Sequence, residues 1–239
     1  MSAGALGRGA VGTGKESEGT VKAENAGARA VWRWPGVAAA LLAVAATLYA
    51  HVAAGQVDPM TTLISDYALL GASAPAMVLG TIALAVGSVW VSYGLARVDP
   101  ARSAAARVLF LAGAVGLLLT AAFTTDTAAG TLSAGGEIHR WSAAVVFTAL
   151  PCAGWLLGRR FRNPLLSVVS ALSVVLLAAF LAAHPGSLVS SLIDGPGYYG
   201  LLQRLLVLSD ALVVLLASLG LGGRGETSRV PTLGVPTLT

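Results

Sequence analysis

The chain has a single cysteine and few charged side chains. Cys152 is the only cysteine among 239 residues, so neither a disulfide within the chain nor a cysteine-based zinc motif can form. Asp, Glu, Lys and Arg make up 11% of the sequence, compared with about 25% in a typical soluble domain. P-loop, dinucleotide-binding, HExxH, GxSxG and EF-hand patterns are all missing. No motif therefore assigns an activity.

Long apolar runs take the place of charge. Hydrophobic residues account for 56% of the chain, and the mean hydropathy is +0.78. Each of six runs is close to the roughly 20 residues that a helix needs to cross a hydrocarbon core. We therefore predict an all-α fold, a polytopic membrane bundle of six transmembrane helices. The predicted spans are about Pro35–Ala54, Leu69–Ala96, Ala104–Thr124, His139–Leu157, Pro164–Ala183 and Tyr199–Leu221.

The two ends of the chain have a different composition. Residues 1–33 are mostly Gly, Ala and Ser with scattered charges, and residues 222–239 are similarly poor in apolar side chains. Segments of this kind bury too little apolar surface to offset the cost of ordering the backbone. We predict two disordered cytoplasmic tails around a six-helix transmembrane domain, residues 34–221.

One alternative concerns the first apolar run, which ends in a sequence, Val52–Ala54, that also fits a signal-peptidase site. Cleavage there would leave five spans and place the new N-terminus outside. The long polar leader before the run and the length of the run itself argue against cleavage, so six spans are the preferred reading.

The basic residues set the orientation. The net charge is +4, but Lys and Arg stand in short clusters between apolar runs, which excludes a nucleic-acid partner and fits a topology signal. The positive-inside rule then places both termini in the cytoplasm, in a multi-pass protein of the cell membrane whose partners are the lipid bilayer and other membrane proteins. Only Arg140 and Arg204 fall on the outer side. The inner side carries Arg8, Lys15, Lys22, Arg29, Arg33, Arg97, Arg102, Arg107, Arg159, Arg160, Arg162, Arg224 and Arg229.

Polar residues gather near the predicted outer face. Each of the three outer hairpins carries one histidine and at least one carboxylate, and these are His51, Asp58 and Asp66, then Asp126, Glu137 and His139, then His184 and Asp194. All three histidines of the chain therefore lie at one membrane face. We take the outer polar cluster as the candidate functional site. Its members are Asp66, Asp126, His139, His184, Gln203, Arg204 and Asp210.

Asp210 is the most unusual member of this cluster. It lies well inside the sixth predicted span, where a charged Asp costs roughly 2.5–3.5 kcal/mol and marks a functional site by default. Gln203 stands seven residues earlier, on the same helical face, and both should point to the bundle interior. Arg204 is offset around the helix and can extend outward or reach a carboxylate from another hairpin.

Simpler interpretations of these residues stay open. Asp66 can cap the second helix, since Asp is favoured there. Asp126 can be solvated at a helix end, and His184 can donate to a backbone carbonyl before a helix stop. Asp210 can be a neutral acid bonded to a neighbouring helix.

Short motifs in the three outer hairpins resemble a known family. They are Ser65–Tyr67, Phe123–Asp126, Gly135–His139 and Gly200–Arg204. Together they resemble a bacterial six-span membrane family catalogued as domain of unknown function nine-nine-eight, over about Trp34 to Leu221. The resemblance implies six helices and a multi-pass membrane protein, and it gives no activity to transfer. It ranks Asp126, His139 and Arg204 first among the cluster residues.

Three functions fit the cluster. A non-catalytic stabilising or regulatory membrane protein is the first, with the polar residues fastening the outer ends of the helices together. An ion-coupled transporter using Asp210 is the second. A membrane-embedded zinc-dependent hydrolase is the third, with His139 and His184 joined by Asp66 or Asp126 as ligands. Our preferred reading needs no cofactor and no resident metal.

Overall fold

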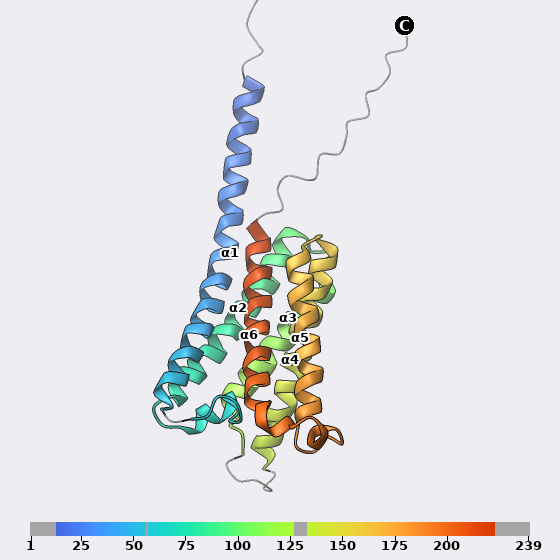
Figure 1. Ribbon diagram of the computed structural model, residues 1–239. Helices are drawn as coiled ribbons and strands as arrows, with labels where there is room; N and C mark the ends of the chain where they lie inside the picture. Colours follow the sequence, from blue (N-terminus) through green and yellow to red (C-terminus); the bar gives the residue numbers. More distant parts are fainter. Residues whose placement is uncertain (1–12, 56, 127–132, 223–239) are drawn as a thin grey trace, which may run out of the picture.

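The protein is a bundle of long helices (Figure 1). The computed structural model describes residues 13–55, 57–126 and 133–222, with side chains from residue 32 onward. Every regular element in this part of the chain is helical, which confirms the predicted all-α fold. The elements are α1 (Thr13–Ala53), the 3-10 helix η1 (Ile64–Leu69), α2 (Ala74–Val98), α3 (Ala104–Ala122), α4 (Ala134–Arg160), α5 (Pro164–Ala183), the 3-10 helix η2 (Ser190–Leu192) and α6 (Gly195–Gly222).

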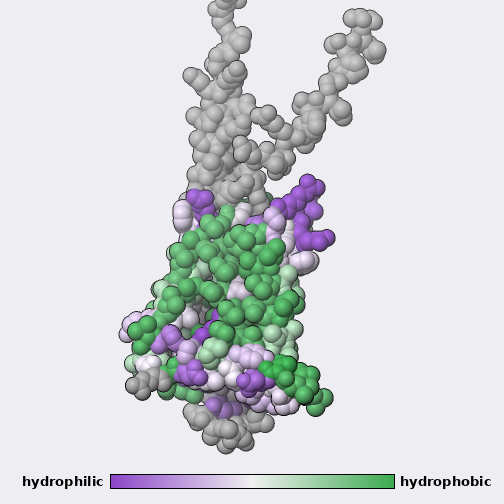
Figure 2. All heavy atoms as spheres, in the orientation of Figure 1, coloured by the Kyte–Doolittle hydropathy of each residue, from purple (hydrophilic) through white to green (hydrophobic). Residues whose placement is uncertain are grey.

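Six helices in the described residues are long and apolar enough to cross a membrane. A belt of hydrophobic side chains covers the face seen in Figure 2, with hydrophilic residues at both ends of the belt. Large apolar side chains such as Leu48, Val115 and Val168 are more than half exposed. Such outward-facing apolar surface is stable in lipid and would be an aggregation hazard in water, so the chain is a multi-pass membrane protein.

The helices close into a ring. Each helix packs on its neighbours in the chain, and α1 also packs on α6. Glycine lets the helices approach closely, since a Cβ on Gly80 of α2 would stand 3.0 Å from the Ala46 Cβ of α1. The chain enters the bundle through α1 and leaves it through α6 at the same end (Figure 1). We call the opposite end, where η1 and η2 lie, the outer end.

Helix boundaries differ from the predicted ones at several points. Residues 13–33, predicted as part of a disordered tail, continue α1 as a helix, and their Ala, Glu and Lys are good helix formers. Residues 1–12 and 223–239 lie outside the described part, so their disorder stays a prediction. The second helix begins at Ala74 rather than Leu69, because Pro75 suits the first helical turn.

The fourth and sixth helices begin earlier than predicted. Helix α4 starts at Ala134, where the Ser133 hydroxyl accepts a 3.0 Å hydrogen bond from the Gly136 amide and caps the helix. Helix α6 starts at Gly195 and includes a non-helical backbone at Tyr198. His139 therefore lies inside the first turns of α4 instead of opening it.

Candidate functional site

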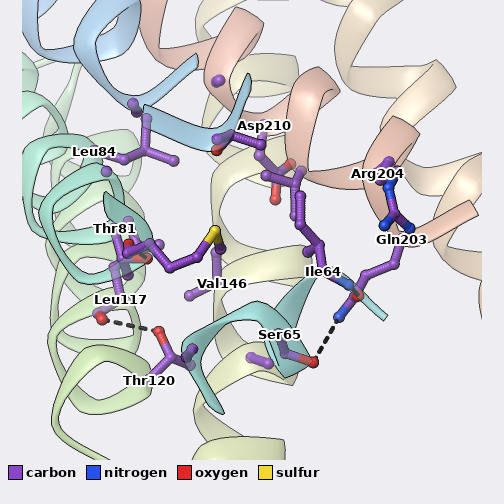
Figure 3. A pocket seen from close by; sticks show the side chains of 18 of the residues that line it. Ile64, Ser65, Thr81, Leu84, Leu117, Thr120, Val146, Gln203, Arg204 and Asp210 are labelled. Carbon is purple, nitrogen blue, oxygen red and sulfur yellow. Dashed lines mark hydrogen bonds between the residues drawn. The ribbon is translucent and has the colours of Figure 1, made fainter. Parts of the chain in front are cut away.

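A cavity of about 310 Å³ lies in the outer half of the bundle. Its wall comes from five helices, α1, α2, α3, α4 and α6, and from the chain between α1 and α2 (Figure 3). Most of the wall is apolar, with Leu84, Leu117 and Val146 among the lining residues. Four of the predicted cluster residues also line it, namely His139, Gln203, Arg204 and Asp210.

The cavity reaches the lipid-facing surface between α1 and α6. Leu48 of α1 and Leu208 of α6 both line it, yet 61% and 43% of their surfaces are exposed. The apolar surface in Figure 2 is hollowed in its lower half, with hydrophilic atoms visible inside the hollow. A molecule dissolved in the membrane can therefore reach the cavity from the side.

The outer end of the cavity is covered by residues 57–70, which we call the outer loop. Helix α6 holds this loop through Gln203, whose Oε1 accepts a 2.6 Å hydrogen bond from the Ile64 amide. The same side chain donates from Nε2 to the Ser65 hydroxyl at 3.5 Å (Figure 3). The Leu201 amide adds a hydrogen bond of 3.1 Å to the Met60 carbonyl.

Arg204 fastens the same loop. Its Nη1 donates to the Thr62 and Gly200 carbonyls at 2.7 and 2.9 Å, and its Nη2 donates to the Tyr67 hydroxyl. The guanidinium also lies 5.2 Å from the centre of the Tyr67 ring. Arg204 thus reaches another hairpin as predicted, but its partners there are the Thr62 carbonyl and the Tyr67 hydroxyl, and the predicted carboxylate partner was wrong.

Tyr67 connects Arg204 to a residue of α1. It is fully buried, and its hydroxyl lies 2.8 Å from Nδ1 of His51. Arginine can only donate, so the Tyr67 hydroxyl accepts from Arg204, and the tautomer of His51 sets the direction of the second hydrogen bond. His51, which carried little weight in the sequence, therefore lines the cavity and joins the network.

Asp210 closes the inner end of the cavity. Its exposed fraction is 1%, and the polar face predicted for α6 is buried as expected, with Gln203 at 7%. The Ser173 hydroxyl of α5 donates to Oδ1 at 2.9 Å, and the Ser209 hydroxyl lies 2.9 Å from that of Ser173. Oδ2 is buried without a hydrogen-bond partner. The carboxyl therefore keeps one oxygen without a hydrogen-bond partner, in a residue that lines the cavity (Figure 3).

His139 and Asp66 flank the cavity on its outer side. The Nδ1 of His139 donates to the Phe123 carbonyl at 2.7 Å, which leaves Nε2 as the second polar atom of the ring. Asp66 lies in η1 and does not cap α2, whose N-cap is Ser73. Burial raises the pKa of Asp66, against a smaller opposite effect from the Leu63 backbone and from the charges of His139 and Arg204.

Two predicted cluster residues lie away from the cavity. Asp126 accepts hydrogen bonds from the Ser133 amide and hydroxyl and packs on Gly136, so it supports the start of α4. His184 is exposed beyond α5, and its Nδ1 accepts a 3.0 Å hydrogen bond from the Gly186 amide instead of donating to a carbonyl. Neither residue is among those that line the cavity.

No metal centre is present among the residues with described side chains. No group of three His, Cys, Asp or Glu residues there is close enough to hold an ion. His139 and His184 could supply ligands only if they converged, and the structure separates one at the cavity from one on the surface. The ligand set of a zinc hydrolase is therefore not assembled.

Several residues of the site escaped prediction. Ser173 and Ser209 look like ordinary small residues of apolar helices, and nothing in the sequence points from Ser173 to Asp210. Thr62 and Ile64 contribute backbone atoms, which carry no sequence signal. Tyr67 lies in the Ser65–Tyr67 motif, in which Asp66 was the predicted site residue.

Comparison with known proteins agrees with this architecture. The family model described as "Protein of unknown function (DUF998)" matches residues 37–220. The chain belongs to the DUF998 family. The match covers all six spans, which confirms the resemblance seen in the hairpin motifs. No curated protein and no solved structure matches the chain. Membership of DUF998 thus fixes the family and leaves the activity to be argued from the cavity.

Proposed function

We propose that the protein binds or carries a small, largely apolar molecule in the outer half of the cell membrane. The observation that carries the proposal is the cavity that reaches Asp210. Burying a carboxyl oxygen without a hydrogen-bond partner costs free energy unless a ligand supplies that partner. Small-molecule sites usually have volumes of about 300–1,000 Å³, apolar walls and a few convergent polar groups. A volume of about 310 Å³ fits the small end of that range.

Entry from the membrane supports the same proposal. Leu48 and Leu208 form part of the wall and also face lipid. The water-facing side is covered by the outer loop, which Gln203 and Arg204 hold in place. A ligand that partitions into the bilayer therefore has a shorter route than one dissolved in water.

The sequence-based alternatives relate to this proposal in different ways. The contacts of Gln203 and Arg204 support the stabilising role, since they fasten the outer ends of the helices together. A bundle with that role alone would have no use for a cavity ending at an acid. A carrier coupled to an ion through Asp210 is a special case of the proposal.

Photolabelling tests the proposal directly. The protein is reconstituted in lipid nanodiscs and labelled with a photoactivatable medium-chain alcohol, and labelled peptides are mapped by mass spectrometry. Val207 lines the cavity, so Val207→Trp should fill it. We expect saturable labelling of α6 near Val207 in the parent and its loss in that variant.

A matched control separates the cavity from the lipid-facing surface. Val175 of α5 is 62% exposed and does not line the cavity, so Val175→Trp should leave the labelling unchanged. Labelling that never saturates and follows only lipid exposure would contradict the proposed function.

A further inference from the structure

The polar atoms around the cavity favour one class of ligand. Among the described residues, Asp210 is the only carboxylate on the wall, and its Oδ2 has no hydrogen-bond partner although the residue is 99% buried. A lone pair in this position needs a proton donor, since a buried acceptor without a partner keeps its full desolvation cost. The ligand group that meets the ionised carboxylate of Asp210 must therefore donate.

Two threonine hydroxyls on the wall have already used their protons. The Thr81 hydroxyl donates to the Met77 carbonyl and the Thr120 hydroxyl to the Leu117 carbonyl, both at 2.8 Å. Figure 3 shows both threonines at the wall. Their oxygens accept but have no further proton to give. His139 similarly donates from Nδ1 to the Phe123 carbonyl.

Arg204 does not neutralise Asp210. The two residues are six positions apart on α6, which corresponds to roughly 9 Å along the helix axis. The guanidinium is directed to the outer loop, where it donates to Thr62 and Tyr67, and it also donates to the Gly200 carbonyl of its own helix. Among the described side chains, the hydrogen-bond partner of Asp210 is the neutral hydroxyl of Ser173.

We propose that the ligand is a lipophilic amine, bound as its ammonium ion. The ammonium group pairs with Asp210, and the hydrocarbon part packs against Leu84, Leu117 and Val146. Opposite charges attract more strongly in this water-poor interior than at the surface. This inference rests on the proposed function, because it names the ligand class of the same cavity.

Three probes with the same hydrocarbon chain test it: an n-alkylammonium, the n-alkanol and the n-alkanoate. Each competes with the photoactivatable alcohol for labelling of parent protein in nanodiscs of zwitterionic lipid, at a pH where the amine is protonated. Competition is corrected for the partitioning of each probe into protein-free nanodiscs. We expect the alkylammonium to bind at least about tenfold more tightly than the alkanol.

Asp210→Asn provides the matched variant, since it keeps the shape of the side chain and removes the charge. It should reduce the preference for the alkylammonium to about onefold while alkanol competition persists. Equal binding of alkylammonium and alkanol by the parent would overturn the inference. This comparison uses the parent protein alone, so it does not depend on whether the variant folds. Tighter binding of the alkanoate would also overturn the inference, and it would indicate that Arg204 binds the charged group of the ligand. If no probe competes, the proposed function itself fails.

Discussion

Arg204 of α6 donates a 2.7 Å hydrogen bond to the carbonyl oxygen of Thr62, 142 residues earlier in the chain. With its bonds to Gly200 and Tyr67, it ties the last helix to the first hairpin. Hydrogen bonds to a charged group contribute roughly 1.5–3 kcal/mol each when buried partners would be left unsatisfied. Arg204 is therefore one of the main contacts that hold the outer loop, together with Gln203.

Arg204→Ala should loosen the outer loop. We expect the free energy of unfolding to fall by about 2–3 kcal/mol, with faster proteolysis of residues 57–70. Arg140→Ala is the control, because Arg140 is an exposed arginine on the same face with a surface ion pair to Glu137, a type of pair that contributes about 0–1 kcal/mol. Equal effects of the two substitutions would show that the loop contacts contribute little.

Ser173→Ala should destabilise the bundle by leaving Oδ1 of Asp210 without its donor. A buried polar group that loses its partner costs about 1–3 kcal/mol. Ser170 lies one turn earlier on α5 and is just as buried, but its hydroxyl bonds the carbonyl of its own helix at Leu166. Thermal unfolding in nanodiscs should therefore show a drop for Ser173→Ala and little change for Ser170→Ala.

The start of α4 offers a second matched pair. A Cβ on Gly136 would overlap the Asp126 carboxylate, whereas a Cβ on Gly135 has its nearest neighbour at 3.7 Å. Gly136→Ala should lower the melting temperature by several degrees, since overlap of this kind costs about 1–3 kcal/mol. Gly135→Ala should be neutral or stabilising, because alanine favours helix. A stable Gly136→Ala protein would mean that the Asp126 loop moves away freely.

Asp66 makes stability depend on pH. Burial raises the pKa of its carboxyl above the ordinary 3.8, so the folded protein holds this proton more tightly than the unfolded chain. The contribution of Asp66 to stability is then lost as pH rises from 3.8 through the folded pKa. Asp66→Asn should be more stable than the parent near neutral pH and lose that advantage in acid. Chemical denaturation at several pH values would test this, and a constant difference would contradict it.

Prediction from sequence succeeded where a pattern repeats along one helix. Hydropathy located six spans, because a lipid-facing helix must be apolar over its whole length. The spacing of Gln203 and Asp210 likewise placed both in the interior, as their burial confirms. These properties belong to one helix and need no knowledge of its neighbours.

Prediction failed where a residue depends on a distant partner. His184 was grouped with the other histidines because it lies at the same membrane face, but α5 ends away from the cavity and leaves it exposed. His51 looked unremarkable and yet meets Tyr67 at 2.8 Å. The cavity itself arises from the divergence of packed helices, which no single segment encodes.

The contacts that close the outer loop come almost entirely from α6, which leaves the ribosome after the other five described spans. During synthesis, the first five helices can insert and pack while residues 57–70 still lack Gln203 and Arg204 as partners. The outer loop gains its contacts, and the cavity gains its α6 wall with Asp210, in the same step, when α6 inserts. A chain truncated before α6 would leave the outer loop without Gln203 and Arg204 and the cavity without one of its walls.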